Sequence, residues 1–181
     1  YFDLKEVVNG ICTKLINRHP HVFNNVDLDM SQFEKTWEEL KRDEKGETSI
    51  TSGLKRIPNH LPALIKAEKI QHKAALIGFD WDDIKDVFEK IEEEYKELLD
   101  ECKQGNIKYI KEELGDLLFS IVNLARFLHI DSEEALNLTN QKFINRFEFM
   151  EENASKLHKK LEDLTLDQME ELWQSAKKNK L

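Results

Sequence analysis

The sequence predicts an all-α protein. Its 181 residues include only six glycines and three prolines, the residues that most often interrupt helices. Glu, Lys and aliphatic residues are abundant, and 35% of the chain is charged. Apolar side chains recur every three or four residues, which is typical of the buried face of an amphipathic helix. A chain of this length can form one domain with a substantial core and a short appendage.

The first part of the chain predicts one amphipathic helix and a connecting segment. An apolar stripe runs through residues 4–17, and the helix ends before Pro20 because proline cannot continue it. A helical pattern returns around residues 32–42. Residues 43–58 are rich in Gly, Ser, Thr and charged residues, which is typical of a linker. We therefore expect residues 24–60 to form a linker with one short helix.

Two helices with clear boundary signals are predicted next. A helix over residues 62–77 begins with a proline, which suits a first turn, and ends at Gly78. A strongly acidic helix follows, and one of Asp80, Asp82 or Asp83 is its expected N-cap.

Three further helices complete the prediction. Gly105 and Asn106 supply a turn after the acidic helix, so the next helix, over residues 107–128, should fold back antiparallel to it. Asp131 and Thr165 each begin a capping-box pattern, in which a polar residue is followed three positions later by Glu or Gln. Each pattern predicts the start of another helix.

Two pairs of carboxylates lie on the antiparallel helices, Glu94/Glu97 on the first and Glu113/Asp116 on the second. The two acids of each pair are three residues apart, so they project from one side of their helix and flank its apolar stripe. Four acids beside a helix interface repel one another unless a cation neutralises them. Oxygen ligands of this kind suit Mg²⁺ or Mn²⁺. The alternative is an ordinary solvated acidic face.

Composition limits the classes of function. The net charge of −9 disfavours binding to nucleic-acid polymers, but a bound divalent cation would still allow a free nucleotide. Cys12 and Cys102 form no disulfide framework, which suits a reducing cytoplasm. No run of about 18 apolar residues and no signal peptide is visible, so we expect neither a membrane span nor secretion.

The chain also repeats part of itself. Shifting the sequence by 128 positions aligns five pairs of identical polar residues: Asp3/Asp131, Glu6/Glu134, Lys14/Lys142, Asn17/Asn145 and Arg18/Arg146. The apolar pairs Val8/Leu136 and Leu15/Phe143 fall in the same register. Residues 1–23 are therefore predicted to be the last helix of an earlier, truncated copy of the same domain. Such a helix exposes its apolar face unless it docks or self-associates.

Short motifs spread over residues 61–179 carry a family resemblance. They are Leu61-Pro-Ala-Leu64, Lys69-Ile-Gln71, Gly78-Phe-Asp-Trp81, Lys90-Ile-Glu-Glu-Glu94-x-x-Glu97, Glu112-Glu-Leu-Gly-Asp-Leu-Leu-Phe119, Val122-Asn-Leu-Ala-Arg126, Lys142-Phe-x-x-Arg-Phe147 and Met169-Glu-Glu-x-Trp173. Together they resemble the C-terminal half of MazG, a family of all-α nucleoside triphosphate pyrophosphohydrolases. Residues 18–23 resemble the tail of the family's N-terminal domain. The resemblance implies a catalytic helical domain over residues 61–181 and a homodimer.

The resemblance also implies roles for individual residues. The implied Mg²⁺ ligands are Glu94, Glu97, Glu113 and Asp116, and the implied substrate-binding residues are Lys142, Arg146, Trp173 and Lys177. Glu93 and Lys90 are implied to support catalysis, with Glu93 as the base or water-positioning group. The cations suit a triphosphate and Trp173 could stack on a base. Without this context, the cations are more typical of a solvated face and Trp173 of a core or dimer contact.

Other classes of function fit the sequence less well. A Gly-Lys-Ser/Thr sequence is absent, so phosphates must be held by metal and basic side chains and not by a Gly-rich loop. A ferritin-like di-iron site needs two Glu-x-x-His motifs, and none of the six histidines has Glu three residues before it. A non-catalytic helical dimerisation or interaction module remains the alternative.

Overall fold

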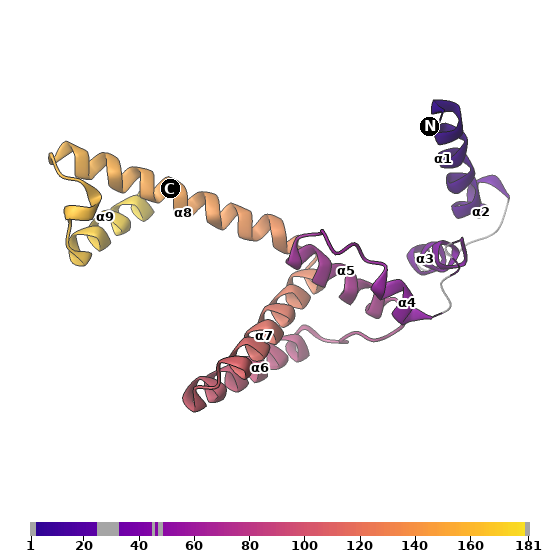
Figure 1. Cartoon of the computed structure of the whole chain (residues 1–181), viewed down its shortest axis with the longest axis horizontal. Helices are drawn as coiled ribbons and strands as arrows, with labels where there is room; N and C mark the ends of the chain where they lie inside the picture. Colours follow the sequence, from indigo (N-terminus) through magenta and orange to yellow (C-terminus); the bar gives the residue numbers. More distant parts are fainter. Residues whose placement is uncertain (1–2, 25–32, 45, 47–48, 180–181) are drawn as a thin grey trace. The chain divides into compact units, whose positions relative to one another are not determined.

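The computed structural model describes residues 3–24, 33–44, 46 and 49–179, and all regular structure in these residues is helical (Figure 1). The helices are α1 Leu4–Arg18, α2 Pro20–Phe23, α3 Phe33–Glu44, α4 Ile50–Lys55, α5 Ala63–Ala75, α6 Ile84–Gln104, α7 Ile107–Phe127, α8 Ser132–Lys156, the 3₁₀ helix η2 Leu161–Asp163 and α9 Leu166–Lys178. The predicted all-α class is confirmed. None of the helices in these residues is long and apolar enough to cross a membrane.

The predicted boundary signals act as expected. Asp83 caps α6, accepting a hydrogen bond of 2.8 Å from the backbone amide two residues on. Gly105 ends α6 with a φ of 74°, a conformation that costs glycine little, and Asn106 caps α7. Asp131 caps α8 through a 3.0 Å bond from a backbone amide, and Thr165 forms a complete capping box at α9.

The chain divides into two units, which we call the N-terminal unit (residues 1–61 and 69–80) and the C-terminal unit (residues 62–68 and 81–181). The N-terminal unit therefore includes the second part of α5, whereas the sequence suggested that the second domain starts at residue 61. An ion pair of 3.0 Å between Lys73 and Glu38 ties this part of α5 to α3.

The interpretation of residues 43–58 as a linker misses α4. Ser49 forms a capping box at the start of this helix, and Gly53 within it is buried. Ile57, just after it, is only 6% exposed. A short helix with Gly, Ser and Thr has little intrinsic stability, so contacts with the rest of the N-terminal unit stabilise it.

Two helix pairs make up most of the C-terminal unit. The helices α6 and α7 lie side by side as an antiparallel hairpin (Figure 1), and its interior includes Val87 and Val122, which are 1% and 2% exposed. The long helix α8 packs against η2 and α9. The core of this second pair is formed by Met150, Ala154, Leu164 and Ala176.

Candidate functional site

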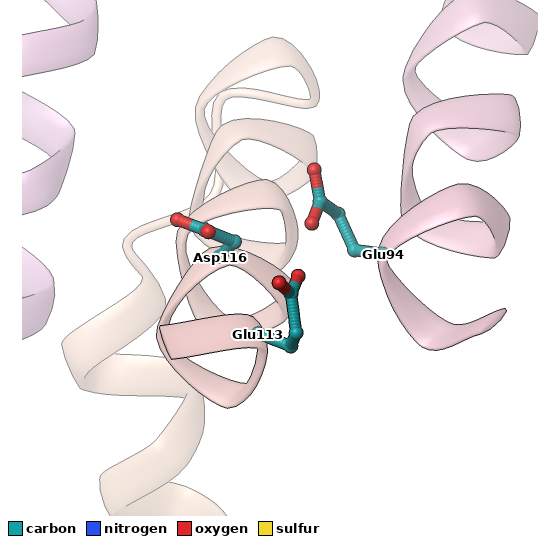
Figure 2. Close-up of side chains that lie close together, drawn as sticks. All are labelled: Glu94, Glu113 and Asp116. Atoms are coloured by element: carbon teal, nitrogen blue, oxygen red, sulfur yellow. The ribbon is translucent and has the colours of Figure 1, made fainter. Parts of the chain in front are cut away.

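Three of the four predicted metal ligands converge on the α6–α7 hairpin. Figure 2 shows Glu94 projecting from α6 toward Glu113 and Asp116 on α7. One carboxylate oxygen from each residue lies within 4.8 Å of the other two. Glu94 is 6% exposed, Glu113 is half-buried and Asp116 is exposed, so the cluster opens toward solvent at the α7 side. The predicted juxtaposition of acids from two helices is present.

Glu97, the fourth predicted ligand, lies at the margin of this cluster. Its side chain is exposed and none of its oxygens joins the group of three. It is nevertheless close enough to Glu113 for its charge to raise the pKa of that residue. The sequence could not distinguish Glu97 from Glu94, because both lie on the same side of α6.

The electrostatics of Glu113 show that the cluster is short of positive charge. Partial burial raises the pKa of Glu113 above its ordinary value, and the charges of Glu97, Asp116, Glu94 and Glu101 raise it further. Neither Glu113 nor Asp116 forms an ion pair with any residue that the structure describes. An all-carboxylate donor set with this excess of negative charge fits a hard divalent cation such as Mg²⁺.

Glu101 is an additional acid that the sequence analysis did not single out. Its Oε1 accepts a hydrogen bond from Gln104 at 3.2 Å, whereas its Oε2 is inaccessible to solvent and has no hydrogen-bond partner in the described residues. Glu101 follows Glu94 by seven residues, two helical turns, so it lies on the same face of α6. This spacing was a signal that could have revealed it.

Lys90 partly balances the buried charge of Glu94. Its ammonium group lies 2.8 Å from Glu94 and 3.1 Å from Glu93. The hydrogen bond to Glu94, followed by that to Glu93, raises the pKa of Lys90 well above its ordinary value. Lys90 therefore stays protonated and supplies a fixed positive charge. The side chain of Glu93 is 55% exposed, so it has access to water.

The predicted substrate-binding residues form a second group on α8 and α9. The Arg146 guanidinium lies 5.1 Å from the centre of the Trp173 ring, a cation–π distance. Phe143 also packs against Trp173, with ring centres 5.1 Å apart. Lys142 and Lys177 are exposed and form no ion pair with the described residues. Trp173 thus has a packing role, and the structure does not join these lysines to the acids of the hairpin.

The raised pKa of Glu113 predicts how metal-free stability depends on pH. Between its ordinary value of 4.5 and its raised pKa, the folded protein holds a proton that the unfolded chain has lost. The contribution of Glu113 to stability therefore falls as pH rises through this window and is constant above it. We expect thermal unfolding in EDTA to show this decline in the wild type and a smaller one in Glu113→Gln. Identical pH profiles for the two proteins would contradict the assignment.

Fold and site together define an all-α protein with a carboxylate centre suited to a divalent cation. The sequence model described as the MazG nucleotide pyrophosphohydrolase domain matches residues 1–23 and 83–149. Two relatives named as nucleoside triphosphate pyrophosphohydrolases match 97% and 99% of this chain. The chain belongs to the MazG nucleotide pyrophosphohydrolase family.

Three relatives illustrate the similarity. The nucleoside triphosphate pyrophosphohydrolase/pyrophosphatase MazG of Thermotoga maritima is 44% identical over 97% of this chain, which spans 66% of that protein. The nucleoside triphosphate pyrophosphohydrolase of Escherichia coli K12 is 38% identical over 99% of this chain, which spans 70% of it. YabN of Bacillus subtilis, an uncharacterized protein, is 44% identical over 98% of this chain, which spans 36% of it. The chain thus covers about two thirds of the two pyrophosphohydrolases.

Proposed function

We propose that this chain hydrolyses nucleoside triphosphates to a nucleoside monophosphate and pyrophosphate and that it requires Mg²⁺, or Mn²⁺ in its place. One observation carries the proposal: Glu94, Glu113 and Asp116 converge from two helices without enough positive charge to neutralise them. Family membership supports the same reaction, as do the printed names of the two pyrophosphohydrolase relatives. In this proposal Glu97 completes the ligand set from the margin of the cluster.

In the proposed reaction, Glu93 and Lys90 have different roles. When bound, Mg²⁺ neutralises the triphosphate and makes a nearby water more acidic. Glu93 accepts the proton of the attacking water, and its exposure is compatible with that role. The water oxygen forms a bond to the α-phosphorus, the bond from that phosphorus to the bridging oxygen breaks, and pyrophosphate leaves. Lys90, always protonated, holds Glu93 and Glu94 in place.

The second group of residues is proposed to bind the nucleotide. Lys142, Arg146 and Lys177 supply charge-assisted hydrogen bonds to the phosphates, since no Gly-rich phosphate loop exists in the sequence. Trp173 offers a ring face for the base, in addition to its packing against Phe143.

A non-catalytic interaction module is the alternative function, and the exposed apolar face of α1 is the observation that favours it. Val8, Ile11 and Leu15 on this face are 48%, 51% and 50% exposed. Such a face suits a partner helix. The alternative gives no role to the acid cluster, so we prefer the enzymatic proposal.

Product analysis and metal titration together test the proposed function. We expect purified protein with Mg²⁺ to release pyrophosphate, and not orthophosphate, from a panel of nucleoside triphosphates. We also expect millimolar Mg²⁺ alone to raise the unfolding temperature, because the folded state binds the ion and the unfolded chain does not. Orthophosphate release would place the cleavage at another phosphorus. Absence of both turnover and metal stabilisation would favour the interaction module.

We also propose that the protein is a homodimer in which two α6–α7 hairpins pack together. Both helices carry a second apolar stripe, turned away from the interior of the hairpin. Its members are 40–52% exposed and comprise Phe88, Tyr95 and Leu99 on α6 and Leu114, Leu118 and Ile121 on α7. Exposed apolar side chains gathered on two neighbouring helices are typical of a protein–protein interface.

The dimer predicts the effect of one substitution in this stripe. Leu118→Glu places a charge in the proposed interface, so we expect it to shift the protein to a monomer in sedimentation or light-scattering measurements. Asp100→Lys is the matched control, because Asp100 is exposed and lies about 120° around α6 from the stripe. A monomeric wild type, or a dimeric Leu118→Glu variant, would contradict the proposed interface.

A cytoplasmic location belongs to the same proposal. Cys12 and Cys102 are both exposed and form no disulfide, which suits a reducing compartment.

A further inference from the structure

The internal repeat extends beyond α1 to α3. Residues 14–18 read Lys-Leu-Ile-Asn-Arg and residues 142–146 read Lys-Phe-Ile-Asn-Arg. A second match appears when the sequence is shifted by 136 positions, and its identical pairs are Asp27/Asp163, Leu28/Leu164, Gln32/Gln168, Glu34/Glu170, Trp37/Trp173 and Lys41/Lys177. The helix α3, interpreted from sequence as part of a linker, is therefore the counterpart of α9. The pair α1 and α3 repeats the pair α8 and α9, with eight fewer residues between the matched segments.

The geometry repeats together with the sequence. In the C-terminal unit the Arg146 guanidinium lies 5.1 Å from the centre of the Trp173 ring. In the N-terminal unit the matching Arg18 guanidinium lies 5.9 Å from the centre of the Trp37 ring. All four residue types proposed to bind substrate thus recur in α1 and α3, as Lys14, Arg18, Trp37 and Lys41.

Two acids distinguish the N-terminal copy. Glu44 lies 2.5 Å and 3.0 Å from two nitrogens of Arg18. Glu38 pairs with Lys41 and, at 3.0 Å, with Lys73 of α5. The sequence counterparts of Glu38 and Glu44 in the other copy are Gln174 and Lys180, neither of which is acidic. In the N-terminal copy, two of the three repeated cations, Arg18 and Lys41, therefore carry a carboxylate partner from α3.

Both ion pairs are partly shielded from solvent. The side chains of Arg18 and Glu44 are 17% and 27% exposed, and those of Lys41 and Glu38 are 22% and 15% exposed, so solvent screens them less than it would fully exposed pairs. Burial disfavours the ionised form of Glu38, but the hydrogen bonds from Lys41 and Lys73 outweigh it and hold its pKa below its ordinary value. The Lys41 ammonium also lies 4.2 Å from the centre of the Trp37 ring.

We propose that α1 and α3 form a second binding site for the phosphate chain of a nucleotide, and that Glu38 and Glu44 close it by occupying its cations in place of phosphate. The proposal rests on the phosphate-binding role proposed for the matching residues of α8 and α9. Both acids belong to the same chain as the cations that they pair with, so they compete with a free triphosphate without having to diffuse to the site. A triphosphate must displace them before it can bind.

The test measures triphosphate binding in the full chain after the second copy has been disabled. Lys142→Ala/Arg146→Ala is the background, and inorganic tripolyphosphate is the probe, measured by calorimetry without Mg²⁺. We expect no measurable binding in this background. Adding Glu38→Gln/Glu44→Gln should then create binding at least about tenfold tighter than the weakest affinity that the calorimeter detects, because both cations become available for charge-assisted bonds to phosphate. A further Arg18→Ala substitution should abolish it.

Matched controls separate opening of the site from a general change in charge. Glu39→Gln removes the charge of an exposed neighbour on α3 and should leave the background without binding. If the double substitution unfolds the N-terminal unit, Glu44→Gln alone replaces it, because this variant keeps both ion pairs of Glu38. We expect Glu44→Gln to bind tripolyphosphate more weakly than the folded double variant would, but measurably. Thermal unfolding of each variant shows which of them is folded.

Three outcomes would overturn the proposal: no gain in the folded Glu44→Gln and Glu38→Gln/Glu44→Gln variants, an equal gain in Glu39→Gln, or tight binding already in the background. Turnover by Glu38→Gln/Glu44→Gln with Lys142 and Arg146 intact is measured separately and should equal that of the wild type. Loss of the proposed enzymatic function would appear as absent turnover in the wild type, whereas failure of the second site appears only in the binding measurements.

Discussion

Asp116→Asn and Glu113→Gln are each expected to lower kcat by about three orders of magnitude or more, because several kcal/mol of transition-state stabilisation depend on the bound cation. Their fold should survive. Each substitution removes one negative charge from a cluster in which Glu113 already has a raised pKa, so the metal-free protein should be as stable as the wild type or more so. Pyrophosphate release measures the first effect and thermal unfolding in EDTA the second.

Glu112→Gln provides the control for both substitutions. Glu112 neighbours Glu113 on α7, but its side chain is 54% exposed and lies 3.9 Å from Lys108. Its replacement should leave turnover and Mg²⁺ stabilisation nearly unaltered. Unfolding of Asp116→Asn or Glu113→Gln at room temperature would instead show that these acids are structural.

The second large effect is expected at the cations of α8. Lys142→Ala and Arg146→Ala each remove a charge-assisted contact worth about 1.5–3 kcal/mol, which corresponds to roughly one to two orders of magnitude in kcat/KM. Mg²⁺ affinity in the absence of nucleotide should stay the same or rise slightly, since a positive charge has been removed. Nucleotide kinetics beside calorimetric Mg²⁺ binding would separate substrate binding from metal binding.

Two features help to interpret the α8 variants. Arg146→Ala also loses the contact with the Trp173 ring, so a modest drop in unfolding temperature should accompany it, whereas Lys142→Ala should leave stability unaltered. Lys156→Ala, at the end of the same helix, is the control for charge alone. If both test variants have the kinetics of the wild type, Lys142 and Arg146 are solvent-exposed cations with no role in substrate binding.

Local signals were sufficient to predict most helices and their ends. A cap such as Asp83 or Thr165 bonds to an amide only two or three residues away, and Gly105 needs only its own backbone freedom to end α6. These interactions do not depend on the rest of the fold, so the sequence predicts them directly. The family also followed from short motifs, and the comparisons with known proteins confirmed it.

Interactions between residues distant in the sequence could not be predicted and were revealed only by the structure. The helix α4 was missed because its stability depends on the burial of Gly53 and Ile57, which no local pattern reveals. The ion pair between Arg18 and Glu44 joins residues 26 positions apart and could not be predicted from local patterns either. A helix of weak propensity and an ion pair between two helices both require the tertiary arrangement.

For the candidate site, the kinds of chemical group, their helices and the side of each helix from which they project could be predicted from the sequence. Which of the acids meet depends on how the two helices pack, and this required the structure. Glu94, Glu97 and Glu101 lie on neighbouring parts of one face of α6, and their order along the chain does not say which is level with Glu113. In the structure Glu94 joins Glu113 and Asp116 in the cluster, whereas Glu97 acts on Glu113 through its charge from outside the group of three, because the packing of α6 against α7 sets which side chains come together.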